Sequence, residues 1–344
     1  MVVQIAEWDV ALADAADRLI LDEAAASTTG ARVVAIGSAA LAAGACVAGA
    51  ESVRAYQDLV ADDGVEELNA QLFSGATVVL LRLPKSLDAL DRLARAIAAF
   101  ADPTVVVFAG GRLKYMTTAM NEVLGRSFGA LDISHARQKS RVLIARSPLA
   151  VAPVAPLREF QSDLGLWVGA VGGVFAGSGI DIGTRAMLAT FDKLPTFETA
   201  IDLGCGSGIL AAELKRRKPS ARVIASDASA DAVASARETM AANALDVEVV
   251  REAGLRSQFD ASADLIVLNP PFHDGGAVTT DIALALFAEA ARVLKPGASL
   301  RVVWNSHLAY RPILRGIVGP TSELSRTAKF TVTESVRHKP LSHK

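Results

Sequence analysis

The sequence has little cysteine, few aromatic residues and no cluster of metal-binding side chains. Cys46 and Cys205 are the only cysteines among 344 residues, so the fold does not depend on a disulfide framework and suits a reducing compartment. These cysteines and the five histidines show no zinc-ligand spacing, so we expect no metal site. The net charge of −2, with 21% charged residues, excludes a highly charged disordered chain.

Long, strongly hydrophobic runs are also missing. Residues 33–50 and 164–180 are uncharged, but the first are mostly alanine and glycine and the second include six glycines. Both stretches are less hydrophobic than the roughly 20-residue apolar helices that cross a bilayer. Residues 1–22 are acidic, unlike the basic start of a secretory signal. We therefore predict a soluble, cytoplasmic protein without a membrane partner.

The chain of 344 residues is long enough for about two domains of ~150 residues. Apolar residues make up 51% of it, which is enough to form packed cores. Three prolines lie within residues 147–156, and such spacing favours extended backbone. We place a first domain at residues 1–150, a linker at 151–159 and a second domain at 160–344. On both sides, short apolar runs alternate with longer helical patterns, which predicts α/β domains with parallel strands and helical crossovers. The predicted strands are Val33–Ile36, Thr77–Leu81, Thr104–Phe108, Thr199–Leu203, Arg222–Ala225, Val247–Val250, Leu265–Leu268 and Leu300–Trp304, and the predicted helices are Ser86–Phe100, Ile209–Arg217, Ala230–Asn243 and Asp281–Leu294.

The two halves also resemble each other in sequence. An apolar strand at Val105–Ala109 precedes Tyr115, just as one at Arg301–Asn305 precedes Tyr310, and each half then returns through a further strand. The returning strands are Arg141–Ala145 and Lys329–Thr333. A repeat of this length predicts two duplicated domains rather than a solenoid. The alternative is that any two α/β domains look alike at this level.

The strongest motif follows the strand Thr199–Leu203 and leads into the helix Ile209–Arg217. It runs Asp202-Leu203-Gly204-Cys205-Gly206-Ser207-Gly208, and its glycines permit a sharp turn and a close approach of a ligand to the backbone. The Gly-Lys-Ser/Thr of a phosphate-binding loop is missing, and an acid two residues before the first glycine suits a cationic ligand. Asp227, at the end of the next strand, can accept the hydroxyls of a ribose. S-adenosylmethionine, with a sulfonium and an amino-acid tail, satisfies both features; the alternative is a structural glycine turn with a helix cap at Asp227.

A second motif, Asn269-Pro270-Pro271-Phe272-His273, stands at the end of the strand Leu265–Leu268. Ligands of open α/β sheets bind at the carboxyl ends of the strands, so this motif should face the same crevice as the glycine loop. The two prolines stiffen the backbone and remove two N–H donors, which leaves carbonyl groups to point into the site. An amide oxygen beside a backbone carbonyl suits an –NH2 group, and Phe272 can stack on a flat ring. The alternative is an ordinary proline turn.

In these two motifs the chain resembles the class I S-adenosylmethionine-dependent methyltransferases that modify amino nitrogens. Residues 173–185, Asn269–His273 and Trp304–Tyr310 resemble more narrowly the ribosomal RNA guanine-N2 methyltransferases, a family that includes small-subunit methyltransferase C and large-subunit methyltransferase G. The resemblance implies two tandem Rossmann-like methyltransferase domains, of which the N-terminal one is degenerate and serves structure or RNA binding. It also implies a monomeric enzyme whose partner is ribosomal RNA or a ribosomal subunit.

The resemblance assigns site residues to the matching positions. In the first half, residues 37–40 lack the glycine series, and Leu83-Pro84-Lys85 at the position of Asn269 offers no amide, so we expect no catalysis from residues 1–150. At the position of Glu252 the family usually has an aspartate that contacts the adenine amino group, and Glu252 would substitute for it. The catalytic residues would be Asn269, Pro270, Pro271 and Phe272, and the cofactor would be held by Asp202, Gly204, Cys205, Gly206, Gly208, Asp227, Glu252 and Asn269.

The implied reaction is an in-line displacement in which a guanine amino nitrogen attacks the methyl carbon. The lone pair of this nitrogen is delocalised into the ring, so the nitrogen must be aimed and its hydrogens accepted. Asn269 Oδ1 and the Pro270 carbonyl would accept the two hydrogens, and Phe272 would hold the unstacked base. Most of the rate would then come from positioning, which can contribute about 7–11 kcal/mol. His273 is expected to be a turn or substrate-side residue rather than a general base.

Positive charge is concentrated in two segments. Residues 112–158 and residues 297–344 each contain eight lysines and arginines and two acidic residues, and they occupy matching places in the two halves, where they would form a basic face for phosphates. Two other functions remain open. One is N-methylation of protein glutamine or DNA adenine, whose enzymes typically have tyrosine at the position of Phe272 and lack the duplicated front half. The other is that of a non-catalytic RNA-binding ribosome assembly factor with the same fold.

Overall fold

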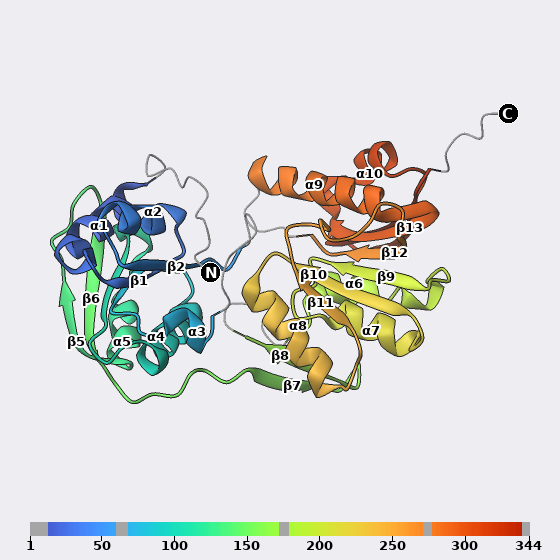
Figure 1. Ribbon diagram of the computed structural model, residues 1–344. Coiled ribbons are helices and arrows are strands. Elements are labelled where there is room, and N and C mark those ends of the chain that lie inside the picture. Colours follow the sequence, from blue (N-terminus) through green and yellow to red (C-terminus); the bar gives the residue numbers. More distant parts are fainter. Residues whose placement is uncertain (1–12, 60–67, 172–178, 271–276, 339–344) are drawn as a thin grey trace. The chain divides into compact units, whose positions relative to one another are not determined.

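The computed structural model describes residues 13–59, 68–171, 179–270 and 277–338, and it divides into two compact α/β units (Figure 1). The first unit contains Met1–Asp58 and Asp62–Ala155, and the second contains Leu59–Ala61 and Pro156–Lys344. Residues 149–156 belong to no helix or strand. The predicted linker at 151–159 is too long at its end, because its last three residues lie in strand β7 and pair with β8.

The first unit is built on a six-stranded sheet with the strand order β2-β1-β3-β4-β6-β5. Strands β1 to β4 run parallel, whereas β6 is antiparallel to β4 and β5 is antiparallel to β6. Helices α1 and α2 bury their apolar side chains against β1, β3 and β4. The elements are α1 (Ala15–Thr28), β1 (Arg32–Ile36), α2 (Ala39–Val47), β2 (Ser52–Tyr56), α3 (Ala70–Phe73), β3 (Val78–Arg82), α4 (Leu87–Phe100), β4 (Val106–Arg112), the 3-10 helix η2 (Leu113–Tyr115), α5 (Thr118–Gly125), β5 (Phe128–Ile133) and β6 (Ser140–Pro148).

The second unit contains a seven-stranded sheet with the order β11-β10-β9-β12-β13-β15-β14 and a separate hairpin, β7–β8. Its five strands from β11 to β13 are parallel, and β15 and β14 continue the sheet in antiparallel pairing. The elements are β7 (Leu157–Gln161), β8 (Leu166–Ala170), α6 (Ile182–Leu188), η3 (Phe191–Lys193), β9 (Thr199–Leu203), α7 (Ile209–Arg217), β10 (Arg222–Asp227), α8 (Ala230–Ala242), β11 (Glu248–Arg251), β12 (Ala263–Leu268), α9 (Ala277–Val293), β13 (Leu294–Asn305), η4 (Ser306–Leu308), α10 (Arg311–Ile317), β14 (Thr321–Arg326) and β15 (Phe330–Val336).

The central strands of the second sheet are buried on both faces. Leu265 and Val267 of β12 join a core that includes α6, α7 and α8, whereas Ile266 and Leu268 join a second core with α9 and α10. Side chains alternate between the two faces of a strand, so a strand covered on both sides consists almost entirely of apolar residues. This burial is why the sequence reveals β12 through the apolar run Leu265–Leu268, and β9 through a short strand in which Asp202 is the only charged residue.

Among the residues that the structure describes, the first sheet repeats the order of the second sheet without a counterpart of its edge strand β11. Strands β1, β2, β3, β4, β5 and β6 correspond in order and direction to β9, β10, β12, β13, β14 and β15. The predicted tandem of α/β domains is therefore confirmed, and the shared strand order supports their origin by duplication.

The strand register corrects the residue alignment of the two halves. Ala109 lies opposite Leu81 and Val302 lies opposite Leu268. Leu81 and Leu268 in turn lie opposite the last residues of β1 and β9, so Ala109 corresponds to Val302. The 3-10 helices η2 and η4 then coincide, and Tyr115 corresponds to Leu308. The predicted match of Tyr115 with Tyr310 is wrong by two residues. Tyr310 is a core residue and Tyr115 is exposed, so the similar spacing of the two tyrosines does not reflect a similar place in the fold.

The predicted elements differ from the observed ones mainly at their ends. The strand at Thr199–Leu203 and the helix at Ile209–Arg217 have their predicted bounds. The strand predicted at Thr104–Phe108 runs instead to Arg112, because its antiparallel pairing with β6 extends that far. The uncharged stretch 33–50 forms most of β1 and the alanine-rich helix α2, which has no polar face to mark it in the sequence. Within the described ranges, no helix is both long and apolar enough to cross a membrane.

Candidate active site

The carboxyl ends of the parallel strands bring the predicted site residues of the second unit together. Strands β9 and β12 are neighbours, and Leu203 lies opposite Leu268, so the glycine loop and Asn269 begin at the same level. Strand β10, which ends at Asp227, lies on the other side of β9. Asp202 precedes the loop by two residues. These groups thus share the edge of the sheet at which open α/β folds bind their ligands.

Backbone hydrogen bonds hold the glycine loop as a tight turn. The N–H groups of Gly204 and Cys205 donate to the Ser226 carbonyl at 2.8 and 3.0 Å. Gly204, Gly206 and Gly208 have φ values of 70°, 53° and 78°. Residues with a Cβ rarely adopt such left-handed backbone conformations. The sequence of the loop therefore matches its backbone conformation at each of the three glycines.

Two of these glycines differ in what surrounds them. A Cβ added at Gly206 would meet no atom within 4 Å, so open space lies beside the backbone there. A Cβ added at Gly208 would lie 2.9 Å from Met240 Cε and 3.1 Å from Ala236 Cα, both on helix α8. Gly206 therefore leaves room for a ligand, whereas Gly208 allows the start of α7 to pack against α8.

Asp202 lies buried beneath the loop. It is 1% exposed, and one carboxylate oxygen accepts a hydrogen bond from the Ala211 N–H, in the first turn of α7, at 3.0 Å. Burial raises the pKa of Asp202 to about 7, and the negative charge of Asp227 adds to this effect, although the Ala211 hydrogen bond opposes it. Among the described residues no lysine or arginine pairs with Asp202. A bound cationic group would therefore stabilise its charged form.

We expect the ligand-free protein to lose stability as the pH rises from about 4 to 7. The Asp202 carboxyl titrates near pH 3.9 in the unfolded chain and at about 7 in the fold, so the folded state binds more protons in this window. The loss could reach roughly 4 kcal/mol, at about 1.4 kcal/mol per pKa unit. Asp202→Asn keeps an acceptor for the Ala211 N–H and should flatten this part of the profile. Urea denaturation of both proteins at pH 5 and pH 7.5 measures the difference; parallel profiles would contradict the prediction.

The carboxylate of Asp227 closes the turn from the neighbouring strand. One oxygen accepts from the Gly206 N–H and the other from the Ser229 N–H, both at 2.9 Å. A carboxylate oxygen can accept more than one hydrogen bond. Glu252 follows β11, and its own N–H donates to the Asp227 carbonyl at 3.0 Å. Its carboxylate accepts from both the N–H and the hydroxyl of Ser257, at 2.6 and 3.0 Å, so Glu252 also holds this loop, and its adenine contact stays a prediction.

A hydrogen-bond network fixes the amide of Asn269. Its Nδ2 donates to Asp181 Oδ2 at 3.3 Å and to Thr184 Oγ1 at 3.1 Å. Asp181 is the N-cap of α6; its Oδ1 accepts from the Gly183 and Thr184 N–H groups, and its Oδ2 also accepts from the Thr184 hydroxyl. An ionised carboxylate only accepts, so the amide must turn its nitrogen toward Asp181 and its oxygen away. No donor to Asn269 Oδ1 occurs in the part of the chain that the structure describes, where this oxygen lies 3.2 Å from the position of a Cβ built on Gly183.

Asp181 and Thr184 had no predicted role. An aspartate directly before a helix is a recognisable N-cap signal, but its contact with Asn269 depends on the packing of α6 beside the sheet. Pro270 is described and buried. Three residues of the second motif (Pro271, Phe272 and His273) lie outside the described ranges, as do residues 172–178, part of the segment that carries the family resemblance.

The first unit repeats this arrangement with different chemistry. The strand register aligns Arg82, at the end of β3, with Asn269. Arg82 pairs with Asp14 at 2.6 Å and with Asp17 at 2.9 Å. Asp14 is the N-cap of α1 and Asp17 lies three residues later, as the two partners of Asn269 do in α6. The prediction that Leu83 occupies this position is therefore wrong by one residue, but its consequence holds, because an arginine side chain has no acceptor atom.

The positive charge of the two basic segments is not all at the surface. Arg301 in β13 is fully buried, where it pairs with Glu334 at 2.6 Å and donates to the Thr190 carbonyl. Arg146 in β6 pairs with Asp132. The prediction that both whole segments face phosphates is thus wrong for Arg301, whose charge serves the interior of the second unit.

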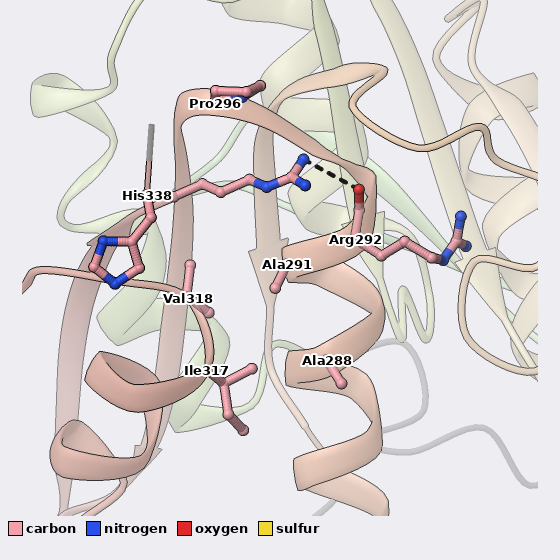
Figure 2. A pocket seen from close by; sticks show the side chains of 8 residues that line it. Ala288, Ala291, Arg292, Pro296, Ile317, Val318 and His338 are labelled. Carbon is pink, nitrogen blue, oxygen red and sulfur yellow. Dashed lines mark hydrogen bonds between the residues drawn. The ribbon is translucent and has the colours of Figure 1, made fainter. Parts of the chain in front are cut away.

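Figure 2 shows a hollow elsewhere on the second unit, between α9, β13 and α10. It lies near the amino end of β13, since Leu294 lies opposite Ala263 at the start of β12, and so at the opposite edge of the sheet from the glycine loop. Its cations already have partners: Arg292 pairs with Glu289 and Asp260. The hollow is therefore separate from the predicted cofactor site. It is lined by Ala288, Ala291, Arg292, Pro296, Ile317, Val318, Arg337 and His338.

Comparisons with known proteins agree with this geometry. The Methyltransferase small domain family matches residues 165–334, and the RLMG N-terminal domain family matches residues 11–149. The chain is 34% identical over 278 residues to ribosomal RNA large subunit methyltransferase G of Shewanella amazonensis, covering 78% of this chain and 71% of that protein. It is 36% identical over 275 residues to the protein of the same name in Streptomyces coelicolor, covering 76% and 72%.

The fold is also found among solved structures. The 16S rRNA N2 methyltransferase RsmC of T. thermophilus, in complex with AdoMet and guanosine, superimposes with a TM-score of 0.77. The match covers 95% of this chain and 93% of that chain at 20% sequence identity. The predicted α/β architecture is therefore shared by a known structure over nearly its whole length.

Proposed function

This chain belongs to the ribosomal RNA large subunit methyltransferase G family, and from that premise we propose that it transfers a methyl group from S-adenosylmethionine to the N2 amino group of a guanine in large-subunit ribosomal RNA. The observation that carries the proposal is the amide of Asn269 at the strand end next to the glycine loop, whose nitrogen is fixed by two hydrogen bonds and whose oxygen has no donor among the described residues. We place the reaction in the cytoplasm, carried out by a monomer on ribosomal RNA or a ribosomal subunit.

The residues at the strand ends fit S-adenosylmethionine. The open space beside Gly206 admits the ligand next to the backbone, and the buried Asp202 suits a positive charge. The carboxylate of Asp227, which ends β10 and holds the Gly206 N–H, would accept the ribose hydroxyls. When bound, the cofactor supplies an electrophilic methyl group on a sulfonium. The Cys205 thiol beside the site is buried and its pKa is well above the usual range, so it stays neutral and does not compete as a nucleophile.

Asn269 and Pro270 would orient the guanine. Both hydrogens on Asn269 Nδ2 have partners in Asp181 and Thr184, so the amide cannot rotate without breaking these bonds. Its Oδ1 would accept one hydrogen of the guanine amino group, and the Pro270 carbonyl would accept the other. The amino nitrogen would then be aimed along the line of displacement, and such positioning can supply about 7–11 kcal/mol of the barrier reduction. Pro271 and Phe272 are proposed to complete the pocket, with Phe272 stacked on the base.

The names of the similar proteins support the choice of substrate. The relatives in Shewanella amazonensis and Streptomyces coelicolor are named for large-subunit ribosomal RNA. The structural relative is named as an N2 methyltransferase and was solved with guanosine. An amide oxygen at Asn269 supports an amino group as the site of methylation. Protein glutamine and DNA adenine also carry such a group, so this oxygen alone does not exclude them as substrates.

We expect the affinity for S-adenosylmethionine to rise about tenfold between pH 6 and pH 8. In the free protein Asp202 is mostly protonated at pH 6, because its pKa is about 7. The positive charge of the cofactor would favour the ionised carboxylate, so binding below pH 7 releases a proton and strengthens as the pH rises. Titration calorimetry in buffers of different ionisation enthalpy counts that proton. Asp202→Asn should bind more weakly and lose the pH dependence; an unchanged slope in this variant would exclude Asp202 as its source.

We expect one cofactor per chain, bound by the second unit. The first unit has Ala35 at the position of Asp202, and Arg82 at the position of Asn269 is engaged with Asp14 and Asp17. It therefore lacks the buried carboxylate and the amide acceptor. Calorimetric titration should give a stoichiometry of one. A stoichiometry of two would show that the first unit is not degenerate in cofactor binding.

The proposed function is tested by nucleoside mass spectrometry of both ribosomal RNAs from a deletion strain. Loss of N2-methylguanosine from the large-subunit RNA, restored by the parent gene and not by Asn269→Ala, is the expected result. The purified protein should then methylate the deletion-strain RNA in a single turnover. Unchanged RNA together with loss of a methylglutamine or of N6-methyladenine in DNA would favour the alternative substrates. No measurable binding of S-adenosylmethionine would favour a non-catalytic assembly factor.

A further inference from the structure

An exposed tyrosine surrounded by positive charge lies at the edge of the first unit that corresponds to the active-site edge of the second. Tyr115, in η2, is 48% exposed. The Nζ atoms of Lys114 and Lys85 lie 4.4 and 5.3 Å from the centre of its ring. Arg112 ends strand β4 immediately before η2. We call these four residues the Tyr115 patch.

The duplicated fold gives this patch its position. Arg82 corresponds to Asn269, so Lys85 corresponds in sequence to Phe272, three residues further along each chain segment. Strand β4 is the parallel neighbour of β3, and Tyr115 follows the carboxyl end of β4. Tyr115 therefore lies beside Lys85, which follows the carboxyl end of β3. The first unit thus carries an aromatic ring and cations after the ends of β3 and β4, the strands that correspond to β12 and β13 of the second unit.

The charges of the patch are available to a ligand. No carboxylate within the described ranges pairs with Lys85, Arg112 or Lys114, whereas nearby Arg82 is neutralised by two aspartates. The pKa of Tyr115 is lowered, first by a hydrogen bond from Lys114 and then by the positive charges of Lys114, Lys85 and Arg112. These cations therefore converge on one exposed ring and leave an uncompensated positive potential there.

We propose that the Tyr115 patch binds an unpaired nucleotide of the RNA substrate, with the base stacked on the Tyr115 ring and the adjoining phosphates held by Lys85, Arg112 and Lys114. A nucleotide joins a flat base to a nearby phosphate, and the patch offers a flat ring with ammonium groups at 4.4 and 5.3 Å. A base inside a duplex has no free face, so the patch selects single-stranded or unstacked RNA. The inference rests on the proposed function, since it takes RNA as the substrate.

The test compares matched variants of the full chain. Tyr115→Ala removes the ring, Tyr115→Phe keeps it, and the double variant Lys85→Ala/Lys114→Ala removes two charges. Arg222→Ala is the control for lost surface charge, because Arg222 is an exposed residue at the amino end of β10, the opposite end of this strand from Asp227. Fluorescence anisotropy measures binding of a single-stranded RNA oligonucleotide and of the same sequence in a duplex. Steady-state methyl transfer to the deletion-strain RNA separates KM from kcat.

Tyr115→Ala should weaken single-stranded RNA binding and raise KM about 10- to 100-fold, as expected for the loss of one base–aromatic stack. Tyr115→Phe and Arg222→Ala should stay near the parent, and kcat and cofactor affinity should not change. The double lysine variant should reduce the slope of log affinity against log salt by about 1.4, for two lost phosphate contacts.

Three results would overturn the inference. They are single-stranded RNA binding that Tyr115→Ala leaves unchanged, an equal loss in Arg222→Ala, and binding for which polyglutamate competes as well as RNA, which would indicate an acidic protein partner. The two proposals fail separately. Methylated guanine with an unaltered KM in Tyr115→Ala refutes only the patch, whereas ring-dependent RNA binding without any guanine methylation refutes only the proposed reaction.

Discussion

Replacement of Asn269 by alanine should lower the single-turnover rate of methyl transfer to ribosomal RNA by about 10²–10³ and leave the affinity for S-adenosylmethionine nearly unchanged. The variant loses the amide oxygen that we propose to accept a hydrogen of the guanine amino group, and with it the amide that Asp181 and Thr184 hold in place. Asp202 and Asp227, which we propose to hold the cofactor, remain in place. Rapid-quench measurement with excess enzyme follows the rate, and calorimetry follows the affinity.

Two further variants separate orientation from simple presence of the amide. Thr184→Val removes a partner of Asn269 Nδ2 and should lower the same rate while Asn269 itself is intact, whereas Thr184→Ser keeps the hydroxyl and should restore it. Asn269→Asp keeps an acceptor but adds a charge, and should retain partial activity. Transfer by Asn269→Ala at the parent rate would mean that the second motif is only a structural proline turn.

Gly206→Val should abolish detectable binding of S-adenosylmethionine in a protein that still folds. The added side chain enters the open space beside the loop, where a Cβ meets no protein atom within 4 Å, and so takes the volume that the ligand needs. The left-handed backbone at this position adds a strain of about 1–2 kcal/mol, which lowers stability without preventing folding. Calorimetric titration measures the binding, and circular dichroism with thermal unfolding verifies the fold.

The matched control is Gly208, two residues along the same turn. Its Cβ would press on Met240 and on the backbone of Ala236, so Gly208→Val should chiefly destabilise the second unit by separating α7 from α8. The two substitutions thus distinguish a ligand-facing glycine from a packing glycine. Unchanged cofactor affinity in Gly206→Val would remove this loop from the binding site.

The sequence by itself determined the elements that are covered on both faces and the motifs that follow them. Strands β9 and β12 are visible as mostly apolar runs because helices bury both of their sides, and Asp202–Gly208 and Asn269–Pro271 mark their ends. It did not reveal α1, whose partners in the sheet lie far along the chain, or α2, which lacks a polar face.

Only the tertiary structure decided what the site residues face. The amide of Asn269 acquires its orientation from Asp181 and Thr184, which lie more than 80 residues earlier and reach it because α6 packs beside the strand ends. Burial, and not local sequence, raises the pKa of Asp202. Pairing between β3 and β4 brings Lys85 to Tyr115. Local patterns record which faces of an element are buried, whereas orientation, charge state and neighbours across a sheet depend on strand register and packing between distant segments.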